Sequence, residues 1–281
     1  MPLSVEGKER SFHENLTLAR TLPAVAGMVN VIGYVNLGYY TSHVTGRVSG
    51  FGVNVAKEKF TEAGFMLGLV VSFIIGAMLA SALIELAKVR HWPRYQLPLL
   101  IEALLLSIIT LFEVSSSVPL TELQPFQKFL FAVALSVSMG LQNALVARLS
   151  GAVVRTTHVT GVSTDLGIES VRVIKWYLEH TKDKTLLEQM RDFSAVKKDA
   201  QLYRVRLYLT ILGSFLFGAT AGGLLNAAIG VIGMAVPILV LVALVIYDRI
   251  LGVSEEDLAE NFNPKFDEKA VVQNAAADAK A

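Results

Sequence analysis

The pentapeptide Ser42-His43-Val44-Thr45-Gly46 returns later in the chain as Thr157-His158-Val159-Thr160-Gly161. Both copies of this phrase lie among long apolar stretches. Polar and ionisable side chains are costly at membrane depth, so a His-containing phrase that occurs twice among hydrophobic segments indicates a functional or structural need. The repetition predicts a tandem duplication, and it places the candidate site at the two phrases.

The likeness between the two halves extends beyond the phrase. The segment GMVN at 27–30 precedes the first copy, as GLQN at 140–143 precedes the second. On the other side, SFIIGA at 72–77 matches SFLFGA at 214–219, which follows a charged insertion in the second half. Because these matches keep the same order, the repeat unit should be about three apolar segments long.

The composition identifies the class of protein. Hydrophobic residues make up 53% of the chain and charged residues only 17%, which indicates a polytopic membrane protein. The spans should be helices, because a single span in lipid must satisfy its own backbone hydrogen bonds and no alternating strands of barrel length occur in the sequence. The six apolar stretches near the ~20 residues that a crossing helix needs are 21–40, 63–86, 97–114, 126–147, 207–228 and 231–247.

The polar stretches suggest how the rest of the chain is organised. We expect a cytoplasmic N-terminal segment at 1–15, a single membrane domain at 16–251 with repeat one at 16–118 and repeat two at 126–251, and a polar, partly disordered tail at 252–281. Repeat two contains a polar insertion at 179–206, which we expect to be cytoplasmic. Its apolar residues recur at helical spacing, as in an amphipathic helix on the membrane surface or in a solvated connecting helix.

The distribution of Lys and Arg orients the chain in the membrane. The stretch 148–206 alone holds 11 of the 25 Lys and Arg residues. By the positive-inside rule, this stretch and both termini face the cytoplasm. Because three spans per repeat is an odd number, the second repeat enters the membrane from the opposite side. We therefore expect an inverted-topology repeat, an arrangement that recurs in transporters and places broken helices at the repeat interface.

Each phrase follows the first span of its repeat, where several glycines supply backbone freedom. A helix that stops, turns and restarts is expected at this point, with Thr45 and Thr160 capping the turns that follow. We expect His43 and His158 to line a shared cavity near the repeat interface together with these two threonines. The alternative is that each imidazole only bridges the interface by hydrogen bonds.

The motifs resemble those of the YoaK-like family of bacterial membrane proteins, which is catalogued as a domain of unknown function. The resemblance rests on Gly-x-x-Asn and Ser/Thr-His-x-Thr-Gly in the first half, and on GLQN at 140–143 with RTTHVTGVSTDLG at 155–167 in the second. It covers about residues 16–251. It implies a multi-span protein of the bacterial inner membrane, and it brings no established substrate or catalytic residue. The role of Arg47, where the family often has a small polar residue, stays open.

Other polar residues near the phrases have two interpretations each. Asn30 and Asn143, like Asn36 and Gln142, could line a pore, but amides in membrane helices more commonly form interhelical hydrogen bonds. Two helices that begin after Thr45 and Thr160, with Arg47 and Arg155 nearby, would favour an anion over a cation.

Three charged residues accompany only the second His. Helical spacing puts Asp165 and Glu169 on the same face as His158, with Arg155 just before it. This face could form a gate or a proton relay, or a surface ion-pair cluster on the cytoplasmic side. Glu102 is a further carboxylate well inside an apolar run, and any functional role of it would belong to one half only. The alternative is that its side chain lies at, or snorkels to, the membrane interface.

Together these features predict a transporter or channel for a small polar or ionic solute. The alternatives are a non-transporting scaffold or sensor and, third, an intramembrane enzyme. We expect no enzyme, because the sequence lacks hydrolase and nucleotide-binding motifs and because Ser42 and Thr157 adjoin their His, where helical side chains do not face each other. The residues that we expect on the solute pathway are His43, Thr45, His158, Thr160, Asn30, Asn143, Arg155 and Asp165.

The sequence also limits cofactors and partners. The chain contains no cysteine, and no carboxylate lies three or four residues after either His of the phrases, so we expect neither a metal nor another cofactor. The expected partners are the lipid bilayer and a small solute, without nucleic acid. Assembly with further copies of the chain is left open.

Overall fold

The computed structural model describes residues 12–90, 95–181 and 200–262 of the chain. All regular structure in these ranges is helical, as expected. The elements are α1 (Phe12–Leu37), α2 (Val44–Ala56), α3 (Phe60–Arg90), α4 (Gln96–Ser115), η2 (Leu120–Glu122), α5 (Pro125–Leu149), α6 (Val159–Thr181), α8 (Ala200–Ile229), η3 (Gly230–Met234) and α9 (Ala235–Phe262).

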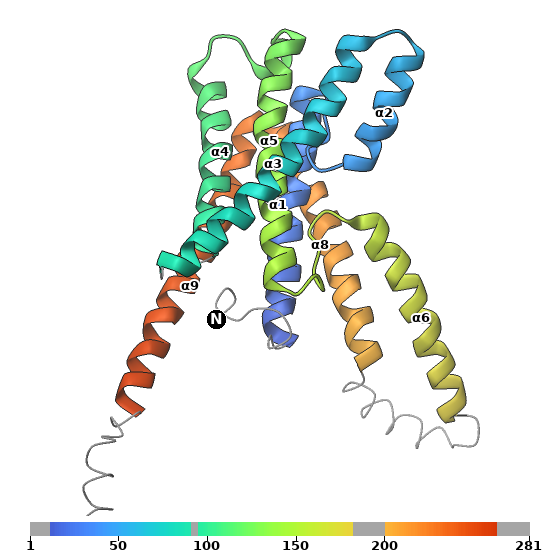
Figure 1. Ribbon diagram of the computed structural model, residues 1–281, viewed down its shortest axis with the longest axis vertical. Coiled ribbons are helices and arrows are strands. Elements are labelled where there is room, and N and C mark those ends of the chain that lie inside the picture. The colour runs from blue at the N-terminus through green and yellow to red at the C-terminus, as the bar shows by residue number, and fades with distance from the viewer. Residues whose placement is uncertain (1–11, 91–94, 182–199, 263–281) are drawn as a thin grey trace, which may run out of the picture.

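Five stretches of the described chain are long and apolar enough to cross a membrane. They are Asn15–Leu37, Phe60–Arg90, Gln96–Ser115, Pro125–Leu149 and Leu202–Ile250. The last stretch is 49 residues long, about twice what one crossing helix needs, and it contains α8, η3 and α9. Gly230 has a φ of 63°, which glycine adopts without strain, and Figure 1 shows α8 and α9 leading away from this turn as separate helices.

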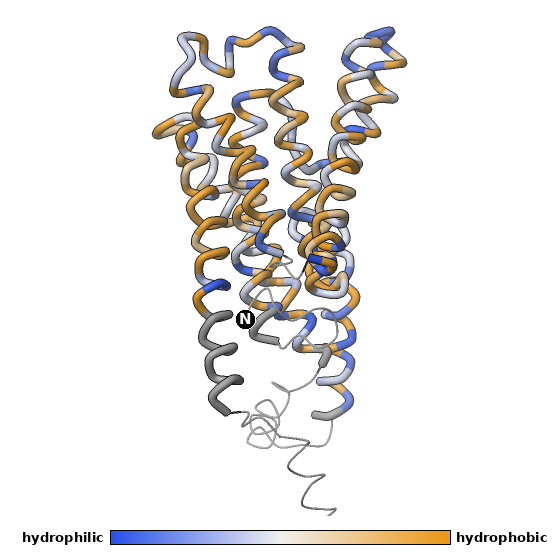
Figure 2. The backbone as a smooth tube through the Cα atoms, turned by 60° about the vertical axis from the view of Figure 1, so that its left-hand side comes forward, coloured by the Kyte–Doolittle hydropathy of each residue, from blue (hydrophilic) through white to orange (hydrophobic). Residues whose placement is uncertain are grey.

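The outward faces of the long helices are apolar. Met78 on α3 and Leu224 on α8 are 65% and 69% exposed, and they are two of many large apolar side chains on the surface. Figure 2 shows hydrophobic residues along most of the length of the helices. A contiguous apolar surface of this size marks contact with lipid in a membrane protein. The chain is therefore a multi-span helical membrane protein, and its number of crossings stays a prediction.

Two helices extend past the ends of their apolar runs. Helix α8 begins at Ala200, inside the insertion expected at 179–206, and α9 runs to Phe262, into the tail expected from residue 252. The helices thus continue through polar residues, and the expected domain boundaries stay predictions. The rest of the insertion, at 182–199, and the rest of the tail, at 263–281, lie outside the described residues.

Each half of the chain contains an additional helix next to its phrase. Helix α2 follows the first phrase and α6 follows the second, so the described residues of each half form four α-helices where three apolar segments were expected. In Figure 1 both helices start close to the centre of the bundle, and α2 rises from it while α6 descends. The two phrases therefore lie between helices that diverge in opposite directions.

Four glycines from the duplicated segments bring α3 against α5 and α8 against α1. The contacts are Gly76 with Val137, Gly140 with Phe73, Gly218 with Ala24, and Gly27 with Phe215. An added Cβ at each glycine would lie under 3.0 Å from the partner's backbone. Such close approach is typical of small residues at interfaces between membrane helices. The contacts correspond in pairs when the two halves are exchanged. Gly76 with Val137 then corresponds to Gly218 with Ala24, and Gly140 with Phe73 corresponds to Gly27 with Phe215.

These contacts predict how the two helix pairs respond to a small increase in volume. Gly76→Ala and Gly218→Ala should each lower the melting temperature of the purified protein, because overpacking costs roughly 1–3 kcal/mol. Gly64→Ala on α3 and Gly213→Ala on α8 are matched controls, since nothing lies within 4 Å of their added Cβ atoms. If all four variants have the same melting temperature, Gly76 and Gly218 do not make these close backbone contacts.

Candidate functional site

An asparagine inside the first helix holds the break that precedes the first phrase. Asn30 is 2% exposed, and its Oδ1 accepts hydrogen bonds from the backbone N–H groups of Thr41 at 2.9 Å and Ser42 at 3.2 Å. The hydroxyl groups of Thr41 and Ser42 also lie 3.2 Å from this oxygen. Backbone N–H groups that are buried outside a helix need an acceptor, and here one side chain supplies it for two consecutive residues.

The second half uses the corresponding asparagine. Asn143 Oδ1 accepts hydrogen bonds from the hydroxyl groups of Thr156 at 3.0 Å and Thr157 at 2.9 Å. Its Nδ2 donates to the carbonyl of Met139 at 2.8 Å. Asn30 and Asn143 thus each bind the phrase of their own half, whereas the commoner use of such amides is between helices.

Two other amides do join helices, as expected. Asn36 Nδ2 donates to Asn226 Oδ1 on α8 at 2.6 Å. Gln142 Nε2 donates to the carbonyl of Leu22 on α1 at 3.2 Å. Both bonds join a helix of the first half to a helix of the second half.

Each phrase leads directly into a new helix. Helix α2 begins at Val44 and α6 at Val159, one residue after the His of each phrase. His43 occupies the N-cap position of α2, and its side chain makes no capping hydrogen bond. The expectation that Thr45 and Thr160 cap these helices is therefore wrong, and both lie in the first turn. The asparagines hold the residues before each His, so the helices start earlier than the threonines.

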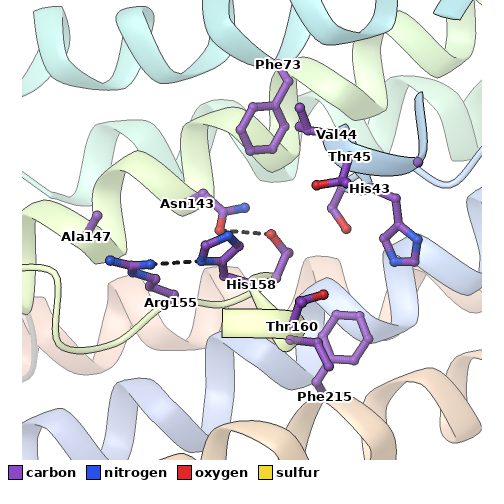
Figure 3. Close-up of a pocket in the computed structure, with 14 residues that line it drawn as sticks. His43, Val44, Thr45, Phe73, Asn143, Ala147, Arg155, His158, Thr160 and Phe215 are labelled. Atoms are coloured by element: carbon purple, nitrogen blue, oxygen red, sulfur yellow. Dashed lines mark hydrogen bonds between the residues drawn. The ribbon is translucent and has the colours of Figure 1, made fainter. Parts of the chain in front are cut away.

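The two phrases meet at one cavity of about 690 Å³. Figure 3 shows His43 and Thr45 of the first phrase with His158 and Thr160 of the second around this space. The lining consists of Ser42, His43, Val44, Thr45, Gly46, Phe73, Asn143, Ala147, Arg155, Thr157, His158, Val159, Thr160 and Phe215. The structure therefore brings together residues that are far apart in the sequence, and their part in a solute pathway stays a prediction.

Two of the expected pathway residues do not line the cavity. Asn30 lies behind the first phrase and supports it, while Asp165 is exposed on α6. Glu169 is 5% exposed, and its Oε1 accepts hydrogen bonds from Arg172 at 2.7 Å and Arg204 at 3.0 Å. Glu169 thus belongs to an ion-pair cluster, which was the alternative to a relay.

Arg155 sets the tautomer of the His158 ring. Arg155 Nη1 lies 2.9 Å from His158 Nδ1, and a guanidinium only donates hydrogen bonds. His158 therefore accepts at Nδ1 and, as a neutral ring, carries its proton on Nε2, an assignment that follows from the hydrogen-bond network. The ring also lies over Gly161, where an added Cβ would be 3.0 Å from Nδ1. His158 thus keeps an Nε2–H donor at the cavity.

Asn30 orients His43 in a comparable way. Because Asn30 Oδ1 accepts backbone N–H groups, its Nδ2 faces His43 Nε2, at 3.3 Å. His43 accepts at Nε2 and carries its proton on Nδ1, and Tyr40 stacks on the ring with centroids 4.6 Å apart. Partial burial lowers the pKa of His43, and the nearby charge of Arg47 lowers it further. Both effects favour the neutral ring at neutral pH.

The structure shows what Arg47 contacts, a point that the sequence left open. Its side chain is buried at 4% exposure and donates to the carbonyl groups of Leu69 at 3.0 Å and Tyr40 at 2.5 Å, and to Ser136 Oγ at 2.9 Å. Arg47 therefore ties α2 to α3 and α5. Val162, which is buried at the corresponding place in α6, has no charge to do the same.

The carboxylate of Glu102 lies apart from this cavity. Its side chain is fully buried on α4, and neither oxygen has a hydrogen-bond partner among the described residues. The alternative interpretation, a side chain that snorkels to the interface, is therefore wrong.

The sequence analysis missed the two phenylalanines of the lining. Phe73 and Phe215 occupy the same place in the two copies of the SFxxGA segment, and Figure 3 shows them on opposite sides of the cavity. Their repetition was visible in the sequence. An aromatic residue in an apolar span, however, gives no sign of whether it faces lipid or a cavity.

The role of Asn30 in the break predicts a stability effect. Asn30→Ala should lower the melting temperature, because the buried N–H groups of Thr41 and Ser42 lose their acceptor, at about 1–3 kcal/mol for each unsatisfied group. Asn54→Ala on α2 is the matched control, since Asn54 is only partly buried. Thermal unfolding of both variants in detergent tests this prediction. If Asn30→Ala and the control have equal melting temperatures, Asn30 does not stabilise the helix break.

Comparisons with known proteins agree with the sequence motifs. A family model described as "Protein of unknown function (DUF1275)" matches residues 18–247. The UPF0700 transmembrane protein YoaK of Bacillus subtilis (strain 168) is 28% identical over 151 residues, which is 53% of this chain and 64% of that protein. The match thus spans less than two thirds of that relative's length. No solved structure matches the chain.

Proposed function

The chain belongs to the DUF1275 family of transmembrane proteins, and we propose that it is a transporter or channel for a small polar or ionic solute. The observation that carries this proposal is the single cavity at which the polar groups of both phrases meet. Groups that replace the water around a solute are costly in a membrane unless they are used. A scaffold, the first of the alternative functions, needs no such polar space between its halves.

We include in this proposal an inverted repeat of two three-span halves in the bacterial inner membrane. The exchange of glycine contacts between the halves supports it, since the contact of Gly76 in the first half with Val137 in the second corresponds to that of Gly218 in the second half with Ala24 in the first. The opposite directions of α2 and α6 support it as well. In such repeats the solute site lies at the interface between the halves, and rocking of one half against the other opens it to each side in turn.

The orientation is tested by labelling single cysteines, because the natural chain has none. Figure 1 places the loop between α4 and α5 and the far end of α6 at opposite ends of the molecule. Ser116→Cys should therefore react with a membrane-impermeant maleimide on intact spheroplasts. Lys175→Cys should react only in inside-out vesicles, because Lys and Arg concentrate on the cytoplasmic side. Reaction of both residues from one side would reject this topology.

A transport route also requires that water reach the cavity. Thr45→Cys and Thr160→Cys should react with a charged, water-soluble thiol reagent, because both residues line the cavity. Ser138→Cys on α5 is the control that should stay unreactive, since Ser138 is fully buried. The reaction is measured by mass spectrometry of the protein in proteoliposomes. A dry, packed cavity would leave all three cysteines unreactive and would favour the scaffold.

A further inference from the structure

One cation lines the shared cavity. In the part of the chain that the structure describes, Arg155 is the only ionised side chain of the lining, and no carboxylate belongs to it. A buried cation would lack a partner at this place, whereas a buried anion would have one. Arg155 donates to His158 through Nη1 alone, so its other N–H groups stay available for a planar oxyanion.

The neutral groups of the lining add hydrogen-bond donors. His158 keeps its Nε2–H and His43 its Nδ1–H, because the other nitrogen of each ring already faces a donor. Helices α2 and α6 are 13 and 23 residues long. Their first turns, which contain Thr45 and Thr160, lie at the cavity. Their free backbone N–H groups and helix dipoles favour negative charge in addition to the side chains.

The rest of the lining is apolar. Phe73 and Phe215 lie on opposite sides of the cavity in Figure 3, and Ala147, Val44 and Val159 complete the apolar part. At about 690 Å³, the cavity is in the range that holds small organic ligands. A bare inorganic anion would leave the two phenyl rings without a contact.

We infer that the cavity binds a small organic oxyanion, such as a carboxylate or sulfonate, with its charge at Arg155 and its apolar body between Phe73 and Phe215. This inference rests on the proposed transport function and names the chemical class of the solute. It also separates the tasks of the halves. The second half supplies the cation, because the first half has Tyr40 at the place of Arg155, and both halves supply the aromatic contacts.

The test uses three probes that share one ring and differ in charge. Benzoate, benzamide and benzylammonium are titrated into the purified full chain by calorimetry at constant ionic strength. We expect benzoate to bind, and the neutral and cationic probes to bind at least tenfold more weakly. Arg155→Gln should weaken benzoate binding roughly tenfold or more, since a charge-assisted hydrogen bond is lost. Lys175→Gln, which removes an exposed cation from α6, the helix that follows Arg155, is the control that should leave binding unchanged.

Two further arms separate the organic oxyanion from a simple anion. Phe215→Ala should weaken the binding of benzoate and not that of acetate, because only benzoate is long enough to contact Phe215 from Arg155. Chloride at the same concentration should not displace benzoate. The inference is overturned if benzoate does not bind, if benzylammonium binds equally well, if Arg155→Gln binds benzoate normally, or if chloride competes equally.

Uptake is measured separately, in proteoliposomes, with radiolabelled benzenesulfonate. This probe stays ionised and so does not cross lipid as a neutral acid. Binding of benzoate with no uptake of benzenesulfonate above protein-free liposomes would contradict transport and leave the solute class standing. Uptake of benzylammonium without oxyanion binding would overturn the solute class and leave transport standing.

Discussion

A helix that stops among apolar neighbours leaves backbone groups that need hydrogen-bond partners. The positions of α2, α6 and the cavity depend on the side chains that supply these partners. Asn30 accepts the N–H groups of Thr41 and Ser42, and Asn143 binds the hydroxyl groups that precede the second His. With the residues before each His held in this way, α2 and α6 start immediately after it. Two helix starts and two imidazoles can therefore face one cavity.

The sequence predicted the large features because they follow from simple patterns. Long apolar runs predicted the helices, and the repeated phrase predicted the position of the breaks. The sequence predicted that a helix restarts after the first phrase but not that α2 would be 13 residues long, because Gly46, Gly50 and Gly52 give it low helix propensity and no long apolar run. The four-way contact of Asn30 was also not foreseen, since its partners lie more than ten residues away and depend on the path of the loop.

The candidate site shows the same division between pattern and packing. Arg155 and His158 stand three residues apart, so their pairing was foreseeable from the spacing, as was the meeting of the two phrases. The distance of Asp165 from the cavity was not, because helical spacing says which face a residue occupies and not what that face meets. Burial of Glu102 likewise depends on the neighbouring helices and not on its own segment.

Arg47 makes the anchoring of α2 different from that of α6. Moving α2 away from α3 and α5 would break the three hydrogen bonds of a buried guanidinium. The matching motion of α6 would break the hydrogen bond between Glu169 and Arg204 on α8. The first turn of α2 is therefore fixed to helices of both halves, whereas α6 is fixed about two turns further along its length.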